Sequence, residues 1–203
     1  MIAIVDYGLG NVKAFANIYL KLNIPFVIAR DVSELGKAEK IILPGVGAFD
    51  YAIDLLDKSG MRKTLDDLVQ EANIPVLGVC VGMQMMATSS EEGFRSGLGW
   101  ISGQVKRFES LISHPINIPH MGWNNIFPKT NNLLMDGLDQ ESRFYFLHSY
   151  YFSCESEDSV LASTNYGNEF ACAIHQRNIY GVQFHPEKSH HWGEKLLNNF
   201  AKL

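Results

Sequence analysis

The sequence contains few cysteines, and their spacing predicts no disulfide framework. Cys80, Cys154 and Cys172 are three among 203 residues, an odd number without regular spacing. A chain of this length buries about 70% of its unfolded surface and needs no covalent staples. We therefore expect free thiols, a reducing compartment and a cytoplasmic location.

The sequence also lacks basic runs and long apolar runs. Its formal net charge is −5, which argues against a nucleic acid or an anionic membrane as a partner. The N-terminus has neither the cationic start nor the apolar core of a signal peptide. No apolar run approaches the roughly 18 residues of a membrane span. We expect a soluble globular protein.

Motifs for metals and dinucleotides are missing as well. Gly8-Leu9-Gly10 begins like a dinucleotide-binding fingerprint, but Lys13 occupies the position of the third glycine. His190 and His191 lie at an expected helix start, without the Cys-x-x-Cys or His-Glu-x-x-His spacing of a zinc site. We expect no metal and no cofactor.

Strand and helix patterns alternate in the first half and give way to strands in the second. Expected strands cover residues 2–5, 26–29, 40–43 and 75–79, and expected helices cover 11–22, with Asn11 as N-cap, 48–57 and 61–72. Further strands are expected at 105–108, 116–119, 144–152, 160–163, 170–175 and 179–184, before a last helix at 189–201. No linker is visible. The pattern predicts one α/β domain over 1–203, with a mostly parallel, flavodoxin-like central sheet flanked by helices and a β-rich second half.

The most informative segment is Gly78-Val79-Cys80-Val81-Gly82, between an expected strand and an expected helix. A single cysteine is usually a small buried hydrophobe. In a strand–turn–helix context, however, Gly-x-Cys-x-Gly is typical of a nucleophile elbow, with flanking glycines that allow a tight bend and close approach. Cys80 is therefore the expected nucleophile, placed beyond the carboxyl ends of the strands.

Downstream, Gln183-Phe184-His185-Pro186-Glu187 supplies a base and a carboxylate. His185 would take the thiol proton, and Glu187 would orient the imidazole. In an extended segment, residues two apart point to the same side, so both side chains would face Cys80. Acyl transfer also needs oxyanion donors. The Val81 N–H is one candidate, and the loop at 44–47, whose glycines make a peptide flip cheap, is the other, unless it is an ordinary turn.

Four segments together resemble the class I (triad) glutamine amidotransferases: 44–47, 78–82, 119–124 and 181–189. More narrowly, they are similar to glutaminase subunits of imidazole glycerol phosphate synthases, over nearly the whole chain. The resemblance implies that Cys80, His185 and Glu187 hydrolyse glutamine to glutamate and ammonia through a thioester. It also assigns an oxyanion region to Val46, Gly47 and Val81.

The resemblance implies binding sites too. Residues at glutamine-holding positions are Gln84, Glu92, His148, Ser149 and Tyr150. The partner would be a (β/α)8 barrel cyclase subunit that receives the ammonia and makes imidazole glycerol phosphate and an aminoimidazole carboxamide ribotide, in histidine biosynthesis. Residues at positions facing that subunit in a heterodimer are Asn11, Pro119, Met121, Trp123, Tyr145 and Lys188. Without the resemblance, Trp123 is also a candidate core residue.

Two alternatives remain open. The segment 189–192, Ser-His-His-Trp, departs from the usual pattern and is similar to paralogues that supply ammonia for sugar amidation in surface polysaccharide synthesis. The other is a scaffold without activity, which the presence of all three triad residues disfavours. If the 44–47 loop must flip, the isolated chain should be nearly inactive until its partner biases the loop.

Overall fold

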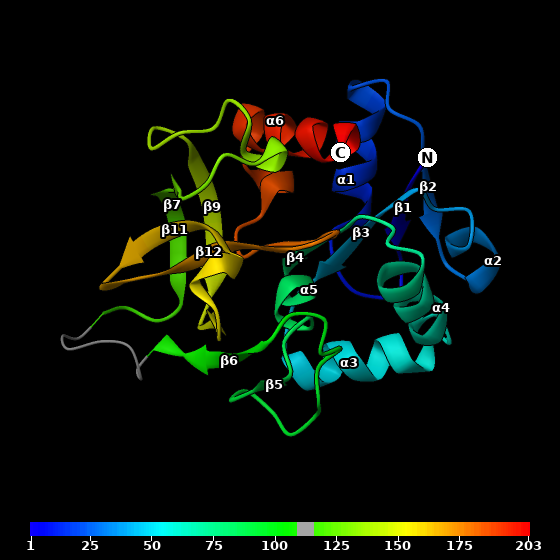
Figure 1. The fold of residues 1–203 in the computed structure, drawn as a ribbon, viewed down its shortest axis with the longest axis horizontal. Helices are drawn as coiled ribbons and strands as arrows, with labels where there is room; N and C mark the ends of the chain where they lie inside the picture. The colour runs from blue at the N-terminus through cyan, green and yellow to red at the C-terminus, as the bar shows by residue number, and fades with distance from the viewer. Residues whose placement is uncertain (109–115) are drawn as a thin grey trace.

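The computed structural model describes residues 1–108 and 116–203, and its main feature is one large mixed sheet (Figure 1). Five neighbouring strands run parallel in the order β2-β1-β3-β4-β13. Their bounds are β1 Ile2–Val5, β2 Phe26–Ala29, β3 Lys40–Gly45, β4 Val76–Cys80 and β13 Ile179–Val182. This parallel part confirms the expected mostly parallel central sheet.

The strands of the second half extend and flank this sheet. Beyond β13 the order continues β12-β10-β6-β5, with β12, β10 and β6 successively antiparallel and β11 and β8 on a branch. Their bounds are β5 Ser89–Ser90, β6 Gly103–Arg107, β8 Phe127–Pro128, β10 Tyr150–Cys154, β11 Val160–Tyr166 and β12 Asn168–Gln176. A separate antiparallel pair consists of β7 His120–Asn125 and β9 Arg143–His148.

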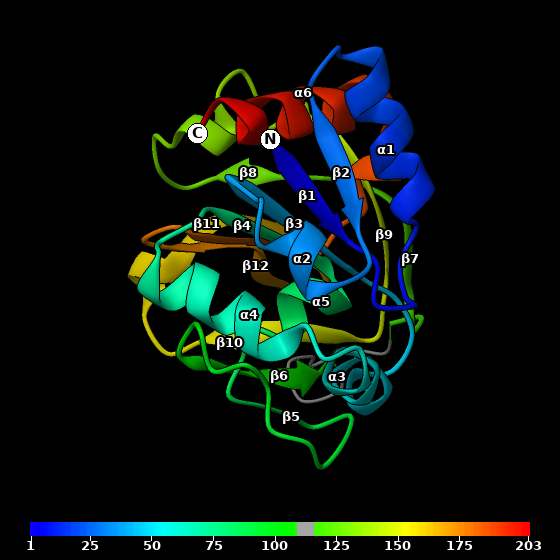
Figure 2. The same cartoon turned by 90° about the vertical axis from the view of Figure 1, so that its right-hand side faces the viewer.

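Helices cover both faces of the parallel strands. Helices α1 and α6 lie on one side and α3, α4 and α5 on the other, while α2 lies by the β2 edge (Figures 1 and 2). The bounds are α1 Val12–Lys21, α2 Val32–Leu35, α3 Phe49–Lys58, α4 Arg62–Asp66, α5 Val81–Gln84 and α6 His190–Lys202. Short 3-10 helices are η3 Leu133–Met135, η4 Glu157–Ser159 and η5 Pro186–Lys188, and η1 Asp67–Glu71 is a π-helix.

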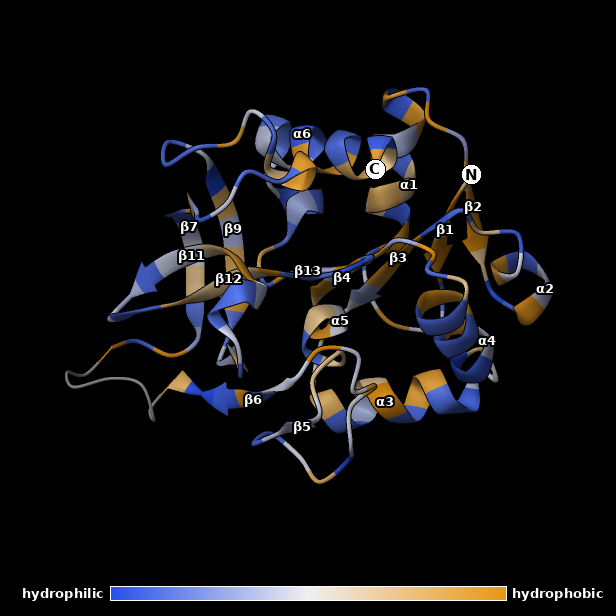
Figure 3. Ribbon diagram, viewed as in Figure 1, coloured by the Kyte–Doolittle hydropathy of each residue, from blue (hydrophilic) through white to orange (hydrophobic). Residues whose placement is uncertain are grey.

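The core lies between the sheet and these helices. Strands β1 and β2 are coloured hydrophobic, whereas the helices carry both hydrophobic and hydrophilic residues along their length (Figure 3). Phe15 and Tyr19 of α1, Phe49 of α3 and Phe200 of α6 are fully buried against the sheet. Within the described residues, no helix combines the length and the apolar character needed to cross a bilayer.

Three expected elements differ from the structure. The expected strand 144–152 is two strands, because the chain leaves the β7–β9 pair at His148 and joins β6 from Tyr150. Residues 116–119 are not a strand, and pairing begins only after Pro119, which has no N–H to donate. The expected helix 61–72 ends as the π-helix η1. Asn11 is the N-cap of α1, but its side chain makes no capping hydrogen bond.

Candidate active site

Cys80 is the last residue of β4 and directly precedes α5. Its backbone has φ 56° and ψ −113°, a strained conformation for a residue with a side chain. Such strain in a strand-to-helix turn is typical of a nucleophile elbow, in which the side chain is held above the sheet edge. The sequence suggested that the flanking glycines make the tight bend. In the structure the strained backbone conformation belongs to Cys80 itself.

The glycines instead allow backbones to touch. A Cβ atom on Gly82 would lie 2.0 Å from the carbonyl oxygen of Leu43, and one on Gly45 would lie 2.3 Å from the nitrogen of Gly82. A Cβ on Gly78 would lie 2.7 Å from the carbonyl oxygen of Gly82. Real Cβ atoms do not approach so closely, so the end of β3 packs backbone against backbone on the elbow. This packing fixes the position of Cys80 relative to the 44–47 loop.

His185 follows β13 and is held by its main chain. Its N–H donates to the carbonyl of Tyr145 in β9 at 2.8 Å. The hydroxyl of Ser189, fully buried, donates to the carbonyl of His185 at 2.6 Å and accepts from the N–H of Tyr145 at 3.0 Å. Strand β9 and the start of α6 thus fix the imidazole next to Cys80.

Glu187 lies on the 3-10 helix η5, not in the extended segment that the sequence suggested. Proline at the first position of a helix is favourable because its missing N–H is not needed there. The turn brings the carboxylate back onto the imidazole, and Nδ1 of His185 lies 2.9 Å from Oε1 of Glu187. The Glu187 Oε2 atom is buried and has no hydrogen-bond partner among the described residues.

The charge of His185 is governed by its two neighbours. Burial alone lowers its pKa, but hydrogen bonds and charge interactions with Cys80 and Glu187 raise the pKa to about 10. An imidazolium is therefore favoured between the sulfur and the carboxylate. For Cys154 and Cys172 burial is the largest influence, and it raises the pKa of both thiols, to about 12 for Cys154.

Two further groups lie near Cys80 that were not predicted from the sequence. The side-chain amide of Gln183 donates to the Cys80 sulfur at 3.8 Å, and the thiol faces the carbonyl oxygen of Leu147 at 3.9 Å. Gln183 stands two residues before His185. In an extended chain residues two apart point to the same side, and this spacing could have predicted that Gln183 faces Cys80. A carbonyl of an exposed leucine leaves no comparable trace in a sequence.

A cavity of about 330 Å³ opens at Cys80 and gathers most of the candidate residues. Cys80 and His185 line it, together with all three oxyanion candidates and all five glutamine-holding candidates. Pro119 and Lys188, expected at a partner interface, also line it, together with Leu147. Segments far apart in the sequence therefore meet at one site, beyond the carboxyl ends of β3 and β4.

The 44–47 loop is held at its base and open at its tip. The hydroxyl of Tyr7 donates to the carbonyl of Pro44 at 2.8 Å, and a Cβ on Gly10 would lie 2.5 Å from the Cβ of Pro44. Gly47 has φ +86°, and a Cβ there would meet no described atom within 4 Å. Val46 is 38% exposed. The loop is therefore tightly packed at its base, whereas Gly47 at its tip has open space on the side where a Cβ atom would stand.

Gln84 and Glu92 both line the cavity and have different hydrogen-bond partners. The Gln84 amide group donates to the carbonyl of Tyr150 at 3.1 Å and to the side-chain oxygen of Gln183 at 3.0 Å. Glu92 accepts the N–H of Phe49, at the start of α3, at 2.9 Å. Burial raises the pKa of Glu92, and the Phe49 hydrogen bond partly opposes that rise.

His148 differs from the other glutamine-holding candidates. Its Nδ1 lies 2.8 Å from the carbonyl oxygen of Tyr150, and its Nε2 lies 3.0 Å from Nδ1 of His120. Both ring nitrogens are therefore occupied by protein atoms. The adjoining Ser149 and Tyr150 also line the cavity.

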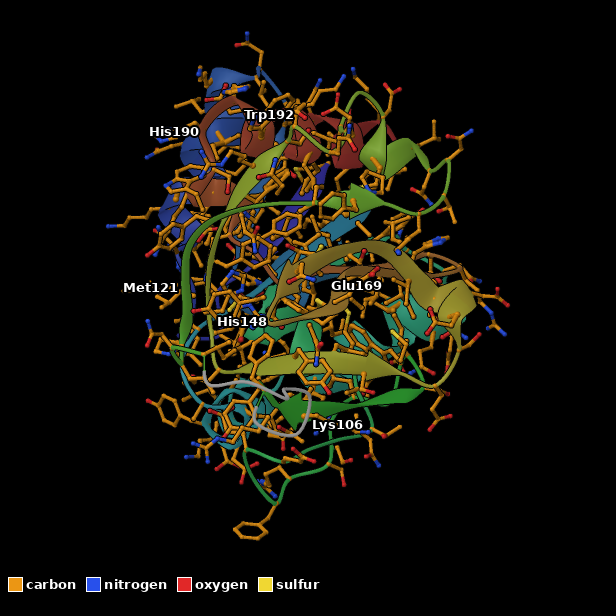
Figure 4. The ribbon with its side chains drawn as sticks, turned by 90° about the vertical axis from the view of Figure 1, so that its left-hand side faces the viewer. Lys106, Met121, His148, Glu169, His190 and Trp192 are labelled. Atoms are coloured by element: carbon orange, nitrogen blue, oxygen red, sulfur yellow. The ribbon has the colours of Figure 1, made fainter. Side chains whose placement is uncertain are left out.

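The remaining interface candidates lie on an exposed surface beside the cavity. Met121 is 65% exposed and Trp123 40% exposed on β7, which excludes the reading of Trp123 as a core residue. Trp123 stacks on His190 with ring centroids 5.2 Å apart, and the Lys188 ammonium lies 5.6 Å from the Tyr145 ring centroid. Met121 and His190 lie at the same margin of the molecule (Figure 4). Asn11 is exposed at the start of α1, next to the Gly10–Pro44 contact.

The Gly8-Leu9-Gly10 turn and the His190–His191 pair serve the fold. Gly10 is needed for its close contact with Pro44, and His190 and His191 begin α6. Within residues 1–108 and 116–203, no group of three or more histidine, cysteine, aspartate or glutamate side chains could hold a metal ion.

Comparison with known proteins gives consistent results. The family model described as glutamine amidotransferase class-I matches residues 3–203. A protein of Bdellovibrio bacteriovorus named imidazole glycerol phosphate synthase subunit HisH is 57% identical over the full length of both chains, and one of the same name from Leptospira interrogans is 53% identical, also over both full lengths. A crystal structure of a glutamine amidotransferase aligns with TM-score 0.75 at 18% identity, covering 100% of this chain and 99% of the other.

Proposed function

The chain belongs to the glutamine amidotransferase class-I family, and from this premise we propose that it is the glutaminase subunit of an imidazole glycerol phosphate synthase. It hydrolyses glutamine to glutamate and ammonia. The observation that carries the reaction is the placement of Cys80 beside the buried His185–Glu187 pair at one cavity. The synthase assignment is supported by relatives of that name that are 52–57% identical over the whole chain.

In the proposed mechanism, His185 takes the thiol proton of Cys80 to form the favoured imidazolium, and the Cys80 sulfur then attacks the carboxamide carbon of glutamine. His185 then gives that proton to the leaving nitrogen, so ammonia departs and a glutamyl thioester remains. Water attacks the thioester with His185 again as base, and the returned proton restores the thiol. Glu187 supports this cycle because it holds the imidazole through Nδ1 and stabilises its cation.

The oxyanion that forms in both steps would be held by main-chain N–H groups. The Val81 N–H follows the nucleophile directly, and the tip of the 44–47 loop, at Val46 and Gly47, would supply a second donor by a peptide flip. The open, positive-φ position of Gly47 above a fixed loop base supports this idea. Partner contact on the exposed Val46 would then bias the loop.

The substrate site uses the remaining candidates. Glutamine is a zwitterion, so Glu92 would meet its ammonium and main-chain groups of the 148–150 segment would meet its carboxylate. Gln84 would support that segment through its hydrogen bond to Tyr150. The cavity of about 330 Å³ is large enough for one amino acid and is lined by these residues.

The proposed partner is a (β/α)8 barrel cyclase subunit that seats on the surface of Met121, Trp123 and Lys188, with Asn11, Pro119 and Tyr145. An exposed tryptophan beside an exposed methionine is typical of an interface, where aromatic anchors carry much of the binding energy. Ammonia would pass from the cavity into the barrel, for imidazole glycerol phosphate and aminoimidazole carboxamide ribotide formation in histidine biosynthesis. The absence of disulfides among the three cysteines supports a cytoplasmic location.

The alternative acceptor, a sugar amidated for surface polysaccharide synthesis, is not favoured by these relatives. The segment that suggested it places His190 against Trp123, on the proposed partner surface. Its departure from the usual pattern therefore concerns how the partner is contacted, not the glutaminase chemistry.

The test pairs the Cys80→Ala variant with the cyclase subunit of the same genome. We expect loss of imidazole glycerol phosphate synthesis from glutamine and unchanged synthesis from added ammonium salts. The Cys154→Ala variant is the control and should keep both activities. Glutamine-dependent synthesis by Cys80→Ala would contradict the assignment of the nucleophile.

A further inference from the structure

Two buried histidines take no part in the proposed proton transfers and face each other between β7 and β9. His120 and His148 are directly opposite in the strand register and are 3% and 6% exposed. Nδ1 of His120 lies 3.0 Å from Nε2 of His148. A buried imidazole is costly unless its nitrogens are paired, so the arrangement of protons in this pair is constrained.

The partners at each end fix where every proton lies. The Tyr150 carbonyl can only accept, so His148 carries its proton on Nδ1 and accepts at Nε2. His120 must then donate from Nδ1 and accept at Nε2. Asn124 supplies that donor at 3.3 Å, and its amide orientation is set because its oxygen accepts the N–H of Asn125 at 2.9 Å. One chain of donors runs from Asn124 to Tyr150.

Both rings are neutral in this arrangement. His120 is stacked between the rings of Phe146 and Tyr166, with centroids 4.6 and 4.1 Å away. Burial lowers the pKa of His120 to about 4 and that of His148 to about 3, where the charge of His185 adds to the effect. A second proton on either ring would set two N–H groups against each other, so the chain of hydrogen bonds requires the neutral forms.

The end of this chain lies at the glutamine cavity. The Tyr150 carbonyl accepts from His148 at 2.8 Å and from the Gln84 side chain at 3.1 Å, so both of its lone pairs are used. Tyr150 and Ser149 line the cavity at the break between β9 and β10. Main-chain pairing holds the break on both sides, through Phe108 N–H to the Ser149 carbonyl at 3.3 Å and through the β10–β6 ladder, and the Gln84 and His148 side chains add two further hydrogen bonds at Tyr150.

The other end of the chain lies under the exposed surface. Successive residues of a strand point to opposite faces, so His120 points inward where Met121 points outward. Met121 lies at the margin of the molecule and His148 lies further inside (Figure 4). Strand β7 thus carries part of the proposed partner surface on one face and the start of the hydrogen-bond chain on the other.

We propose that His120 is a positioning residue for glutamine, acting through His148 on the Ser149–Tyr150 backbone of the cavity. The hydrogen bond between His120 and His148 also connects that backbone to β7, the strand that carries Met121 and Trp123. This inference rests on the proposed glutaminase function, but it concerns the binding of glutamine and is independent of the ammonia acceptor.

The test compares two variants of His120 in the complex with the cyclase subunit. His120→Phe keeps a ring between Phe146 and Tyr166 but removes the donor to His148. His120→Asn restores an amide N–H close to the place of Nδ1. For His120→Phe we expect the KM for glutamine to rise about ten-fold with kcat changed less than about three-fold. His120→Asn should keep the KM within about three-fold of the parent chain.

A second readout separates this inference from the proposed function. Inactivation of Cys80 by the glutamine analogue 6-diazo-5-oxo-L-norleucine needs no acceptor, and its half-saturating concentration should rise by the same factor in His120→Phe. Wild-type values of both quantities in His120→Phe would overturn the inference, and so would equal rises in the Phe and Asn variants. Absence of glutamate release by the parent complex would instead contradict the proposed function.

Discussion

His185 and Glu187 form a buried hydrogen-bonded pair, with Nδ1 and Oε1 2.9 Å apart and neither side chain more than 3% exposed. The pair is built by a 3-10 turn that follows β13, so the carboxylate approaches the imidazole from within the same short segment. It lies in turn beside Cys80, whose hydrogen bond also favours the imidazolium. Because the fold stabilises the charged form of His185, the protonation of this residue contributes to the free energy of unfolding and can be measured through its pH dependence.

The first prediction concerns the stability of the pair at different pH values. The pKa of His185 is raised to about 10, above the unfolded value of 6.5. Its contribution is therefore complete below pH ~6.5 and is lost as the pH rises towards 10. Glu187→Gln should lower the free energy of unfolding by about 1–3 kcal/mol at pH 6, and by progressively less up to pH 10. Urea denaturation of both chains at several pH values measures this, and a difference that grows with pH would contradict it.

The second prediction distinguishes the thiols. Burial, with a contribution from Glu157, raises the pKa of Cys154 to about 12, so its thiolate is about a thousand-fold rarer than that of an ordinary cysteine. Cys80 borders an open cavity. Iodoacetamide at neutral pH should modify Cys80 at least about a hundred-fold faster than Cys154 or Cys172. Peptide mass spectrometry measures the three rates, and labelling of Cys154 first would exclude Cys80 as the reactive thiol.

The third prediction concerns the loop tip. Gly47 has φ +86°, where an L-residue costs about 1–2 kcal/mol. If the Val46–Gly47 peptide flips to form the oxyanion site, φ at Gly47 turns negative, so Gly47→Ala favours the flipped loop. Glutamate release by the isolated chain should then rise about five- to thirty-fold.

The control is Gly60→Ala. Gly60 has φ +71°, and its Cβ would also meet no described atom within 4 Å, so both variants should lose similar stability. Only Gly47→Ala should change glutamate release. An unchanged or lower rate in Gly47→Ala would rule out the Val46–Gly47 peptide as the flipping donor.

The fourth prediction concerns the partner surface. Trp123 is 40% exposed and stacks on His190. Trp123→Ala should weaken association with the cyclase subunit at least about 30-fold, as expected for an aromatic anchor. The control is Leu20→Ala, since Leu20 is 68% exposed at the end of α1, by the opposite edge of the parallel strands. Titration calorimetry measures both, and equal affinities for the two variants would contradict the assigned surface.

The fold was largely predictable because its parallel half follows local rules. Strands such as β1 and β4 are buried on both faces and appear in the sequence as continuous apolar runs. In the helices between the strands, apolar residues recur at helical spacing. The break at Ser149 was not predictable, since residues 144–152 keep a strand-like composition while they change from one sheet to another. Only the pairing partners, which are distant in sequence, fix that break.

The site was predictable where chemistry and spacing coincide. The Gly-x-Cys-x-Gly elbow and the His185–Glu187 pair stand out by residue type, although the sequence suggested the wrong local geometry for both. The donor from Gln183 to the Cys80 sulfur and the link from His120 to His148 were missed. Both contacts join residues that are distant in the sequence. The two histidines could also have been ordinary core residues, so their types alone did not indicate the link.

The most direct test of this account is glutamate release by the purified chain, alone and mixed with the cyclase subunit of the same genome, with and without its ribotide substrate. We predict a very low rate for the isolated chain and stimulation of at least about a hundred-fold in the complex with ribotide, as one oxyanion donor is gained. Equal turnover with and without the partner would contradict both the synthase assignment and the gated oxyanion site.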